Sequence, residues 1–294
     1  MKTANPRTRA YRIFSIVVLV ILAILFLFPL YWIVTGAFKP AADIYNQEPV
    51  WWPTEWVANN FQNLMARRTA PLYSIGGLEG PVVPAAFRWM LNTVFMSTAA
   101  MLLTCITAAM AGYALAKKRF AGRAIVFSLI VCAMALPKQV ILIPLLKEMA
   151  ALNLYDTLWA VIFPTVGWPF GVFLMKQFSE SIPGEILEAA RIDGASEAKT
   201  FITVVLPMVK PGIGALSIFT FINSWNDYFM QLVMLPSGEN YTISMGISSL
   251  QAETTIDMGL LMAGAALASI PIIIVFLIFQ KYFTQGITMG AVKG

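Results

Sequence analysis

The chain has 294 residues, 59% of them hydrophobic and only 12% charged, about half the charged share of a soluble domain. It contains no histidine, which excludes histidine-based acid–base catalysis and histidine-ligated metal sites. Cys105 and Cys132 lie in apolar segments, so we expect them to pack against helices or lipid and not to form a disulfide.

Apolar segments of about 20 residues predict membrane-spanning helices. Six such segments lie at residues 13–38, 89–116, 124–137, 157–175, 211–235 and 258–280. The first is too long for the apolar part of a cleaved signal peptide. The third is followed at once by Lys138, and the fifth is interrupted by Asp227. The pattern predicts an all-α membrane protein with six transmembrane helices and with both termini on one side.

The positive charges set the orientation of these helices. If the N-terminus lies inside, most of the 20 lysine and arginine residues fall in internal segments. The strongest signal is the cluster after the second helix, formed by Lys117, Lys118, Arg119 and Arg123. Both termini are therefore expected in the cytoplasm. Because the net charge of +5 follows this pattern, no nucleic-acid partner is expected.

The chain is expected to form a single transmembrane domain over residues 1–294, with its core at 87–283. An external loop is expected at 39–88, a cytoplasmic loop at 177–210 and a cytoplasmic tail at 284–294.

The external loop has two parts of different character. Trp51, Trp52 and Trp56 suit the membrane interface. Residues 71–84 are rich in glycine and proline and predict irregular structure.

The cytoplasmic loop contains an alanine-rich, charged segment. Pro183 and Gly184 predict the start of a short helix, and Gly194 suits the left-handed residue that commonly follows a helix. Ser196 can cap a second helix, which Pro207 ends or kinks. Small alanine side chains would let this corner fit into a groove of another protein. The alternative is an amphipathic helix that rests on lipid headgroups.

Several short motifs carry a resemblance to a known family. Glu188-Ala189-Ala190, Asp193-Gly194-Ala195, Leu206-Pro207 and Pro211 resemble the EAA loop of bacterial ABC importer permeases. Residues 112–116 with Phe120 and Gly122 resemble the carbohydrate branch, and residues 225–227 and 286–294 resemble its maltose-type second permease subunit. The resemblance covers residues 87–294 and most of 13–38. Residues 67–84 depart from the shorter linker of the family.

The resemblance implies the type I ABC importer permease fold and a multi-pass location in the bacterial inner membrane. It implies a permease subunit of a binding-protein-dependent importer that moves a carbohydrate, such as a maltodextrin-like or alginate-type oligosaccharide. Its partners would be a second homologous permease, two ATPase subunits, an external periplasmic substrate-binding protein and membrane lipid. The chain has no P-loop motif, so we expect no catalytic residue, metal or cofactor here, and ATP and Mg²⁺ on the ATPase subunits.

The same resemblance assigns candidate ATPase contacts at two places. In the docking loop they are Glu185, Glu188, Ala189, Ala190, Asp193, Gly194, Ala195 and Ser196. Glu188 would pair with a basic residue of the ATPase, or it could cap its own loop. In the tail the contacts are Gly290, Val292, Lys293 and Gly294, with a disordered end as the alternative.

Polar residues near the outer side suggest two further sites. Asp227 is the only acidic residue within the six predicted helices, where an ionised carboxylate costs roughly 2.5–3.5 kcal/mol. The candidate translocation pathway consists of Asn223, Trp225, Asn226 and Asp227. The alternative is an external helix end that is bonded to neighbouring backbone.

The acidic segment 235–257 is a candidate docking loop for the binding protein, with a merely solvated loop as the alternative. Its candidate contacts are Glu239, Asn240, Gln251 and Glu253. An ion-coupled secondary transporter is the alternative function, but it would require several charges within the membrane.

Overall fold

The computed structural model describes the backbone of residues 6–75, 78–253 and 257–291, and the side chains of these residues except 6–10, 75, 252–253 and 283–291. In chain order the elements are α1 (Pro6–Ala37), α2 (Ala41–Ile44), α3 (Asn59–Ala66), β1 (Thr69–Pro71), β2 (Ser74–Ile75), β3 (Leu78–Glu79), β4 (Val82–Pro84), α4 (Ala85–Lys117), α5 (Arg123–Ala133), α6 (Lys138–Ala151), α7 (Trp159–Val166), α8 (Pro169–Glu180), α9 (Gly184–Ile192), α10 (Glu197–Thr200), the π-helix η1 (Phe201–Val205), α11 (Leu206–Met208), α12 (Lys210–Asn226), α13 (Tyr228–Met234), α14 (Ile243–Glu253) and α15 (Met258–Ala291).

Four helical segments are long and apolar enough to cross a membrane. They are Tyr11–Ala37, Ala85–Lys117, Trp159–Glu180 and Met258–Tyr282. Two bent helix pairs also qualify if each pair counts as one span. These pairs are α5 with α6, bent by 106°, and Glu197–Met208 with α12, bent by 76°. The described part of the chain therefore has four to six candidate spans.

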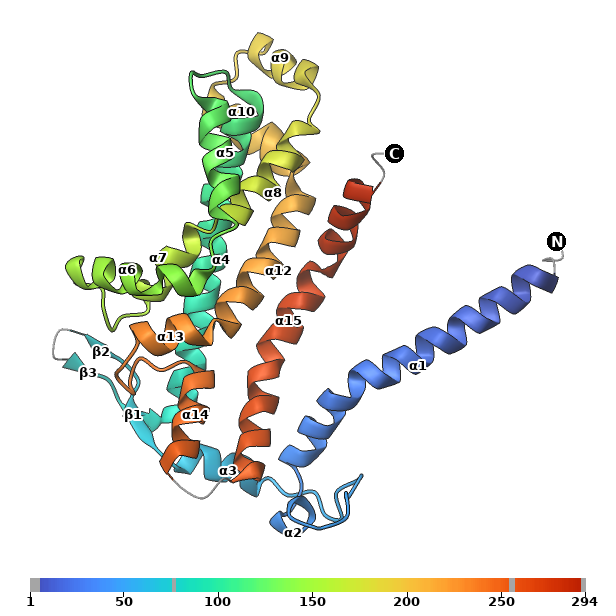
Figure 1. Ribbon diagram of the computed structural model, residues 1–294, viewed down its shortest axis with the longest axis vertical. Helices are drawn as coiled ribbons and strands as arrows, with labels where there is room; N and C mark the ends of the chain where they lie inside the picture. The colour runs from blue at the N-terminus through green and yellow to red at the C-terminus, as the bar shows by residue number, and fades with distance from the viewer. Residues whose placement is uncertain (1–5, 76–77, 254–256, 292–294) are drawn as a thin grey trace.

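Two predicted spans are not single helices in the structure. Residues 124–137, extended by residues 120–122, were expected to cross the membrane, but α5 has only 11 residues, too few for a hydrocarbon core of about 30 Å. The chain turns at Pro137, and α6 runs across the direction of α5 (Figure 1). Residues 211–235 were expected to form one span interrupted by Asp227, and Asp227 separates them into α12 and α13.

The bundle is built around α4, which packs against α7, α8 and α12. Close approach of α4 to α8 depends on Gly112, because an added Cβ there would lie 2.6 Å from backbone atoms of Met175 and Lys176. Large buried side chains, among them Trp89 and Phe221, fill the remaining space around α4. Small residues thus set the helix spacing, as is common in membrane bundles.

The first helix stands apart from this bundle. The most apolar stretch of α1 has no buried residue, and the helix diverges from α15 along its length (Figure 1). At its other end Trp32 contacts Trp51 edge to face at 5.8 Å, and the Lys39 ammonium lies 4.1 Å from the Trp32 ring. The start of α1 and the end of α15 both lie towards the end of the molecule that carries α9, away from α2 and α3 (Figure 1).

Residues 39–88 contain a β-hairpin, so the prediction of irregular structure for residues 71–84 was wrong. Strand β1 pairs antiparallel with β4, and β2 with β3. Between them, Leu72 N donates to Pro81 O at 2.9 Å and Gly80 N to Tyr73 O at 2.8 Å, which continues the same register. The fold is therefore helical with one small hairpin. Two segments of seven residues separated by Gly76-Gly77 are a recognised sequence signal for a hairpin. The glycine and proline residues of 71–84 led instead to the prediction of irregular structure.

Candidate functional site

The corner predicted within residues 177–210 is confirmed by the structure. Helix α9 ends at Ile192, and Gly194 follows with φ +74°. Ala195 N donates to Ala190 O at 3.0 Å, which closes the helix end around the left-handed glycine. Ser196 then caps α10 by accepting a bond from Lys199 N. The sequence folds this way because glycine adopts a positive φ without steric cost.

The corner is fixed to the bundle by two kinds of contact. Leu187, on the inner side of α9, is buried in the core. Lys117, in the last turn of α4, donates to Ile182 O at 2.6 Å and so holds the chain just before α9.

Glu197 is an anchor of the loop that the sequence did not single out as a site residue. Its carboxylate forms an ion pair with Lys118 and accepts from Arg191 and Tyr113, each at 3.4 Å. The Lys118 hydrogen bond lowers the pKa of Glu197, and the charges of Lys118 and Arg191 and the Tyr113 hydroxyl act in the same direction. Glu197 therefore connects α10 to α9 and to the end of α4.

The outward surface of the corner combines carboxylates with small and apolar side chains. Glu185, Glu188, Ala189, Asp193 and Ser196 are exposed, whereas Ala190 and Ala195 are half-buried. Glu188 forms no ion pair or hydrogen bond with any described residue.

The same surface carries Ile192, which is 86% exposed. Ile192 was not among the contact residues predicted from the sequence, because an isoleucine in a short helix is more often buried than exposed. An exposed isoleucine rimmed by carboxylates is typical of a surface that another protein covers.

The bundle contains a cavity of about 250 Å³ where three helix breaks meet. These are the breaks between α5 and α6, between α7 and α8, and between α12 and α13. The cavity is lined by Ala133, Met134, Leu136, Lys138, Ile141, Leu145, Pro164, Thr165, Gly167, Trp168, Pro169, Asp227 and Met230. Its lining is mostly apolar, with two opposite charges on its wall.

Asp227 has two structural roles at this cavity. Its Oδ2 lies 3.1 Å from Lys138 Nζ, and its Oδ1 accepts from Met230 N at 3.4 Å at the start of α13. The Lys138 ammonium also lies 5.5 Å from the centre of the Trp168 ring. Asp227 therefore bonds to neighbouring backbone at a helix end and also lies on the wall of the cavity.

The other candidate pathway residues do not gather around the cavity. Asn223 and Asn226 donate to carbonyls of their own helix, Phe219 O and Ile222 O, each at 2.9 Å. Trp225 is 1% exposed and stacks on Phe221, so its side chain packs in the core instead of lining the cavity. The sequence alone does not show whether a tryptophan next to polar residues packs in the core or lines a cavity.

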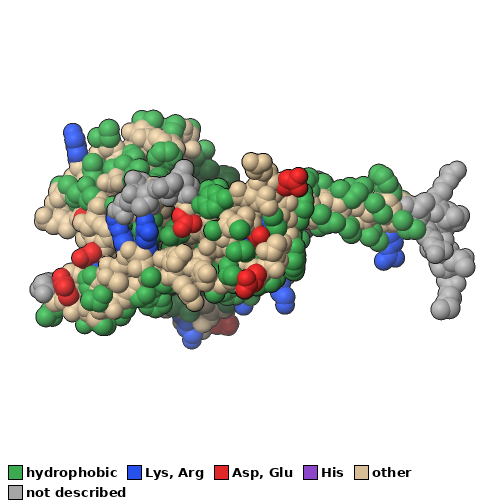
Figure 2. Space-filling model, turned by 90° about the horizontal axis from the view of Figure 1, so that it is seen from below, with side chains coloured by type: hydrophobic (Ala, Val, Ile, Leu, Met, Phe, Trp, Pro, Cys, Tyr) green, Lys and Arg blue, Asp and Glu red, His purple; other side chains and the backbone are tan. Residues whose placement is uncertain are grey.

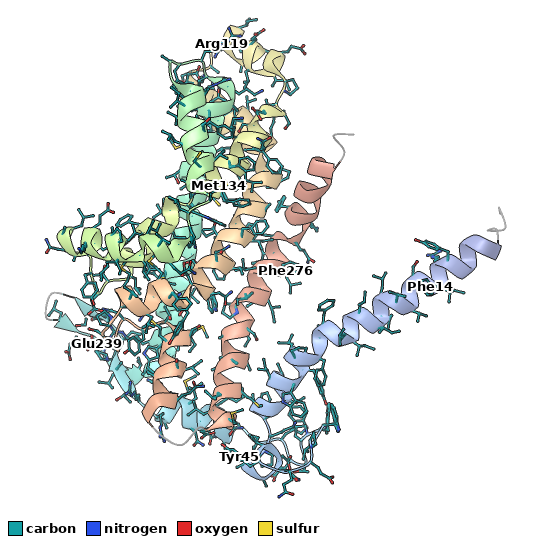
Figure 3. The ribbon with its side chains drawn as sticks, viewed as in Figure 1. Phe14, Tyr45, Arg119, Met134, Glu239 and Phe276 are labelled. Carbon is teal, nitrogen blue, oxygen red and sulfur yellow. The ribbon has the colours of Figure 1, made fainter. Side chains whose placement is uncertain are left out.

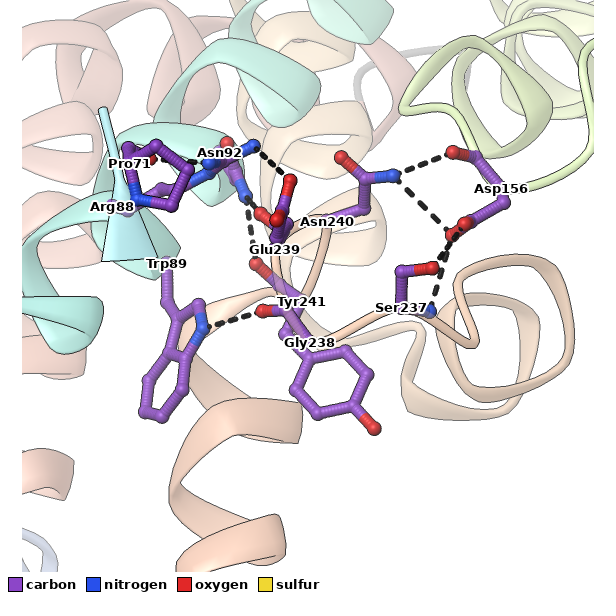
Figure 4. A network of polar contacts seen from close by, with 10 residues as sticks. All are labelled: Pro71, Arg88, Trp89, Asn92, Asp156, Ser237, Gly238, Glu239, Asn240 and Tyr241. Atoms are coloured by element: carbon purple, nitrogen blue, oxygen red, sulfur yellow. Dashed lines mark hydrogen bonds and ion pairs between the residues drawn. The ribbon is translucent and has the colours of Figure 1, made fainter. Parts of the chain in front are cut away.

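The candidate docking segment 235–257 is folded onto the end of α4. Arg88 lies 3.6 Å from the Glu239 carboxylate, and Trp89 Nε1 donates to Gly238 O at 2.9 Å (Figure 4). Asn92 donates to Glu239 O at 2.9 Å and to Tyr241 O at 3.0 Å. The first turns of α4 therefore fix the path of this loop.

Asp156 fixes the other side of the loop. It accepts from Ser237 N at 3.2 Å, and its carbonyl accepts from Asn240 at 2.6 Å (Figure 4). Asn240 thus braces the loop from within, while the Glu239 side chain remains 44% exposed. Gln251 is exposed on α14, and the Glu253 side chain lies outside the described residues.

The predicted tail partly continues a helix. Helix α15 extends to Ala291 and includes Gly290. Val292, Lys293 and Gly294 lie outside the described residues. Arg119 lies at the end of the molecule that carries α9, and Glu239 lies on the far side of α6 from it (Figure 3).

Comparison with known proteins identifies the family. Residues 106–289 match the model of the binding-protein-dependent transport system inner membrane component. This chain belongs to that family. The family expected from the EAA motif is therefore confirmed, and the chain is a permease component of such a system.

Two curated relatives of this permease align over nearly their whole length. It is 32% identical to the arabinooligosaccharides transport system permease protein AraQ of Bacillus subtilis, over 99% of both chains. It is 29% identical to the diacetylchitobiose uptake system permease protein DasC of Streptomyces coelicolor, over 96% of this chain and 98% of that one.

Solved structures share the fold of the permease. A chain of a bacterial ABC transporter that imports the acidic polysaccharide alginate superposes with a TM-score of 0.77 at 23% identity, over 96% of this chain and 100% of that chain. A bacterial alginate ABC transporter in complex with a periplasmic protein bound to an alginate pentasaccharide gives a TM-score of 0.57 at 15% identity, over 92% and 93%.

Proposed function

We propose that this permease is one of two homologous membrane subunits of an importer that carries an oligosaccharide across a bacterial inner membrane. It would cross the membrane six times, with both termini in the cytoplasm. The relatives named for arabinooligosaccharide and diacetylchitobiose transport support the substrate class. Four clear spans and two bent pairs support the count.

The single observation that carries the proposal is the exposed corner at Gly194. It stands at the basic end of the bundle and presents Ile192 and Glu188 to solvent, fixed from behind by Leu187 and Glu197. The chain has no P-loop motif, so ATP and Mg²⁺ would be bound by two partner ATPase subunits, which receive this corner. The tail from Gly290 to Gly294 would reach the same partners.

The second permease subunit would cover α1. A helix whose most apolar stretch has no buried residue needs lipid or protein around it, and its divergence from the bundle leaves room for a neighbouring chain (Figure 1). An external substrate-binding protein would deliver the saccharide to the end that carries Glu239.

Helix α4 would transmit the movement. Lys117 and Lys118 connect its inner end to the docking corner, and Arg88, Trp89 and Asn92 connect its outer end to the 237–241 loop. The movement caused by closure of the ATPase subunits would thus be transmitted from the docking corner to the 237–241 loop through one helix of 33 residues. This is a rigid-body switch between two states that different ligands favour.

The saccharide would pass near the cavity at the three helix breaks. Trp168 offers a ring face, and Lys138 and Asp227 offer charged groups, in a cavity of about 250 Å³. Asn223 and Asn226 lie in the last turn of α12, which ends directly before Asp227.

The test is reconstitution of the complete complex in proteoliposomes with its companion subunits. A saccharide with its binding protein is expected to stimulate ATP hydrolysis and uptake together. The control is the complex without binding protein, which should hydrolyse ATP slowly. Uptake by the isolated permease down an ion gradient would contradict the proposal and support an ion-coupled carrier.

A further inference from the structure

The β-hairpin of residues 69–75 and 78–84 presents one apolar face. Paired residues of an antiparallel ladder lie on the same side, and side chains alternate along each strand. One face of the ladder therefore carries Pro71, Tyr73, Leu78, Gly80 and Val82. On it Tyr73 is 48%, Leu78 73% and Val82 71% exposed.

The opposite face of the hairpin is partly covered by the protein. Ala70 and Val83 are half-buried, and Ala70 packs against the core. The Tyr73 ring lies against Gly80 so closely that a Cβ there would be 2.7 Å from it, which stiffens the apolar face. The exposed side chains thus belong to an ordered surface.

Arg88 joins this hairpin to the candidate docking loop. Its guanidinium donates to the carbonyl of Pro71, in β1, and lies 3.6 Å from the Glu239 carboxylate (Figure 4). The Arg88 side chain is only 6% exposed, so the contact is built into the structure. The hairpin and the 237–241 loop therefore form one continuous surface, which we call the outer platform.

The outer platform lies at one end of a helix that is longer than the hydrocarbon core is thick. Helix α4 has 33 residues and is about 50 Å long, whereas the hydrocarbon core is about 30 Å thick. The two ends of α4 together therefore extend about 20 Å into the polar layers on either side of the core. Seen from this end, hydrophobic side chains lie among acidic and basic ones, as on a protein-binding surface (Figure 2).

We propose that the apolar hairpin face of Tyr73, Leu78 and Val82 is a docking surface for the external substrate-binding protein. The inference rests on the proposed function, because it requires a binding protein as partner. One observation favours this occupant over a lipid surface or the second permease. The buried Arg88 side chain makes the face continuous with the polar loop that carries Glu239, at the end where the proposed function places the binding protein.

The first test titrates the binding protein that stimulates the wild-type complex against ATP hydrolysis in proteoliposomes. The double variant Leu78→Ser with Val82→Ser should need about tenfold more binding protein for half-maximal stimulation, because exposed apolar contacts of this size carry much of an interface energy. The maximal rate and the rate without binding protein should not change. Ser74→Ala, on the opposite face, is the matched control and should titrate like the wild type.

The second test does not depend on loss of function. A photo-crosslinking residue at position 78 should form an adduct with the same binding protein in intact cells, and one at position 74 should not. Adducts of position 78 with lipid or with the second permease would overturn the inference. The inference would also be overturned if the double variant titrated like the wild type and only position 239 formed adducts with the binding protein. If no binding protein stimulates the wild-type complex, the proposed function itself fails.

Discussion

Lys138 and Asp227 form an ion pair, with 3.1 Å between Nζ and Oδ2, although 89 residues separate them in the chain. Each residue begins a helix at a break, Lys138 at the start of α6 and Asp227 at the cap of α13. The pair thus holds two bent helices together on the wall of one cavity. An interaction at this place can stabilise one arrangement of the helices around the cavity.

We predict that the two residues of this pair are energetically coupled. Asp227→Asn keeps an acceptor for the cap of α13 but leaves the Lys138 ammonium without its counter-charge. In a double-mutant cycle with Lys138→Met, the coupling should be about 1 kcal/mol, since Lys138 is 42% exposed. Thermal unfolding of the purified complex measures it. Lys147→Met, an exposed lysine of α6, is the control, and strictly additive effects would contradict the coupling.

Gly194→Val is expected to uncouple ATP hydrolysis from transport. The glycine has φ +74°, and no atom lies within 4 Å of the place that a Cβ would take, so the penalty of about 1–2 kcal/mol comes from the backbone alone. Uptake per ATP hydrolysed in proteoliposomes measures the effect. Gly194→Asn is the matched control, because asparagine tolerates this conformation and should retain most transport. Normal coupling in the valine variant would exclude the corner as the force-transmitting contact.

Acid should loosen the docking corner through Glu197. Its pKa is lowered from 4.5 by the Lys118 hydrogen bond and by nearby positive charge, so its stabilising contribution is complete above pH 4.5 and is lost as the pH falls through the lowered value. Because the side chain is 59% exposed, we expect less than about 1 kcal/mol. Amide exchange of residues 184–200, corrected for intrinsic rates, should show protection that falls in acid.

Glu197→Gln should lower that protection at neutral pH and remove this part of its acid dependence. Glu185→Gln, on the exposed side of α9, is the control and should retain the wild-type profile. Identical profiles for the wild type and the Glu197 variant would show that the ion pairs with Lys118 and Arg191 do not hold the corner.

Gly112→Ala should destabilise the bundle by about 1–3 kcal/mol, the usual cost of overpacking. The added methyl would lie 2.6 Å from the backbone of α8, which cannot move as a side chain can. Thermal unfolding of the purified complex provides the measurement. Gly184→Ala is the matched control, since nothing lies within 4 Å of its Cβ position and alanine favours a helix. Equal stability of the two variants would mean that α4 and α8 can separate freely.

Local features of the fold could be predicted from the sequence because they depend on neighbouring residues. The corner around Gly194 follows from one residue that tolerates a positive φ, and the cap at Ser196 from a hydroxyl three residues before an amide. Long apolar segments likewise predicted the four candidate spans that need no bent helix pair. The hairpin could have been predicted from Gly76-Gly77 between two segments of equal length, but proline at 71, 81 and 84 favoured irregular structure.

The sequence by itself thus determined the class of protein, through its long apolar segments, its lack of a P-loop motif and its charged, alanine-rich corner. Only the tertiary structure decided which charges meet. Glu197 and Lys118, Arg88 and Glu239, and Lys138 and Asp227 all pair across distant segments. The physical reason is that hydrophobicity and backbone preference act along the chain, whereas an ion pair depends on how helices bend and pack, as at the breaks before Lys138 and at Asp227.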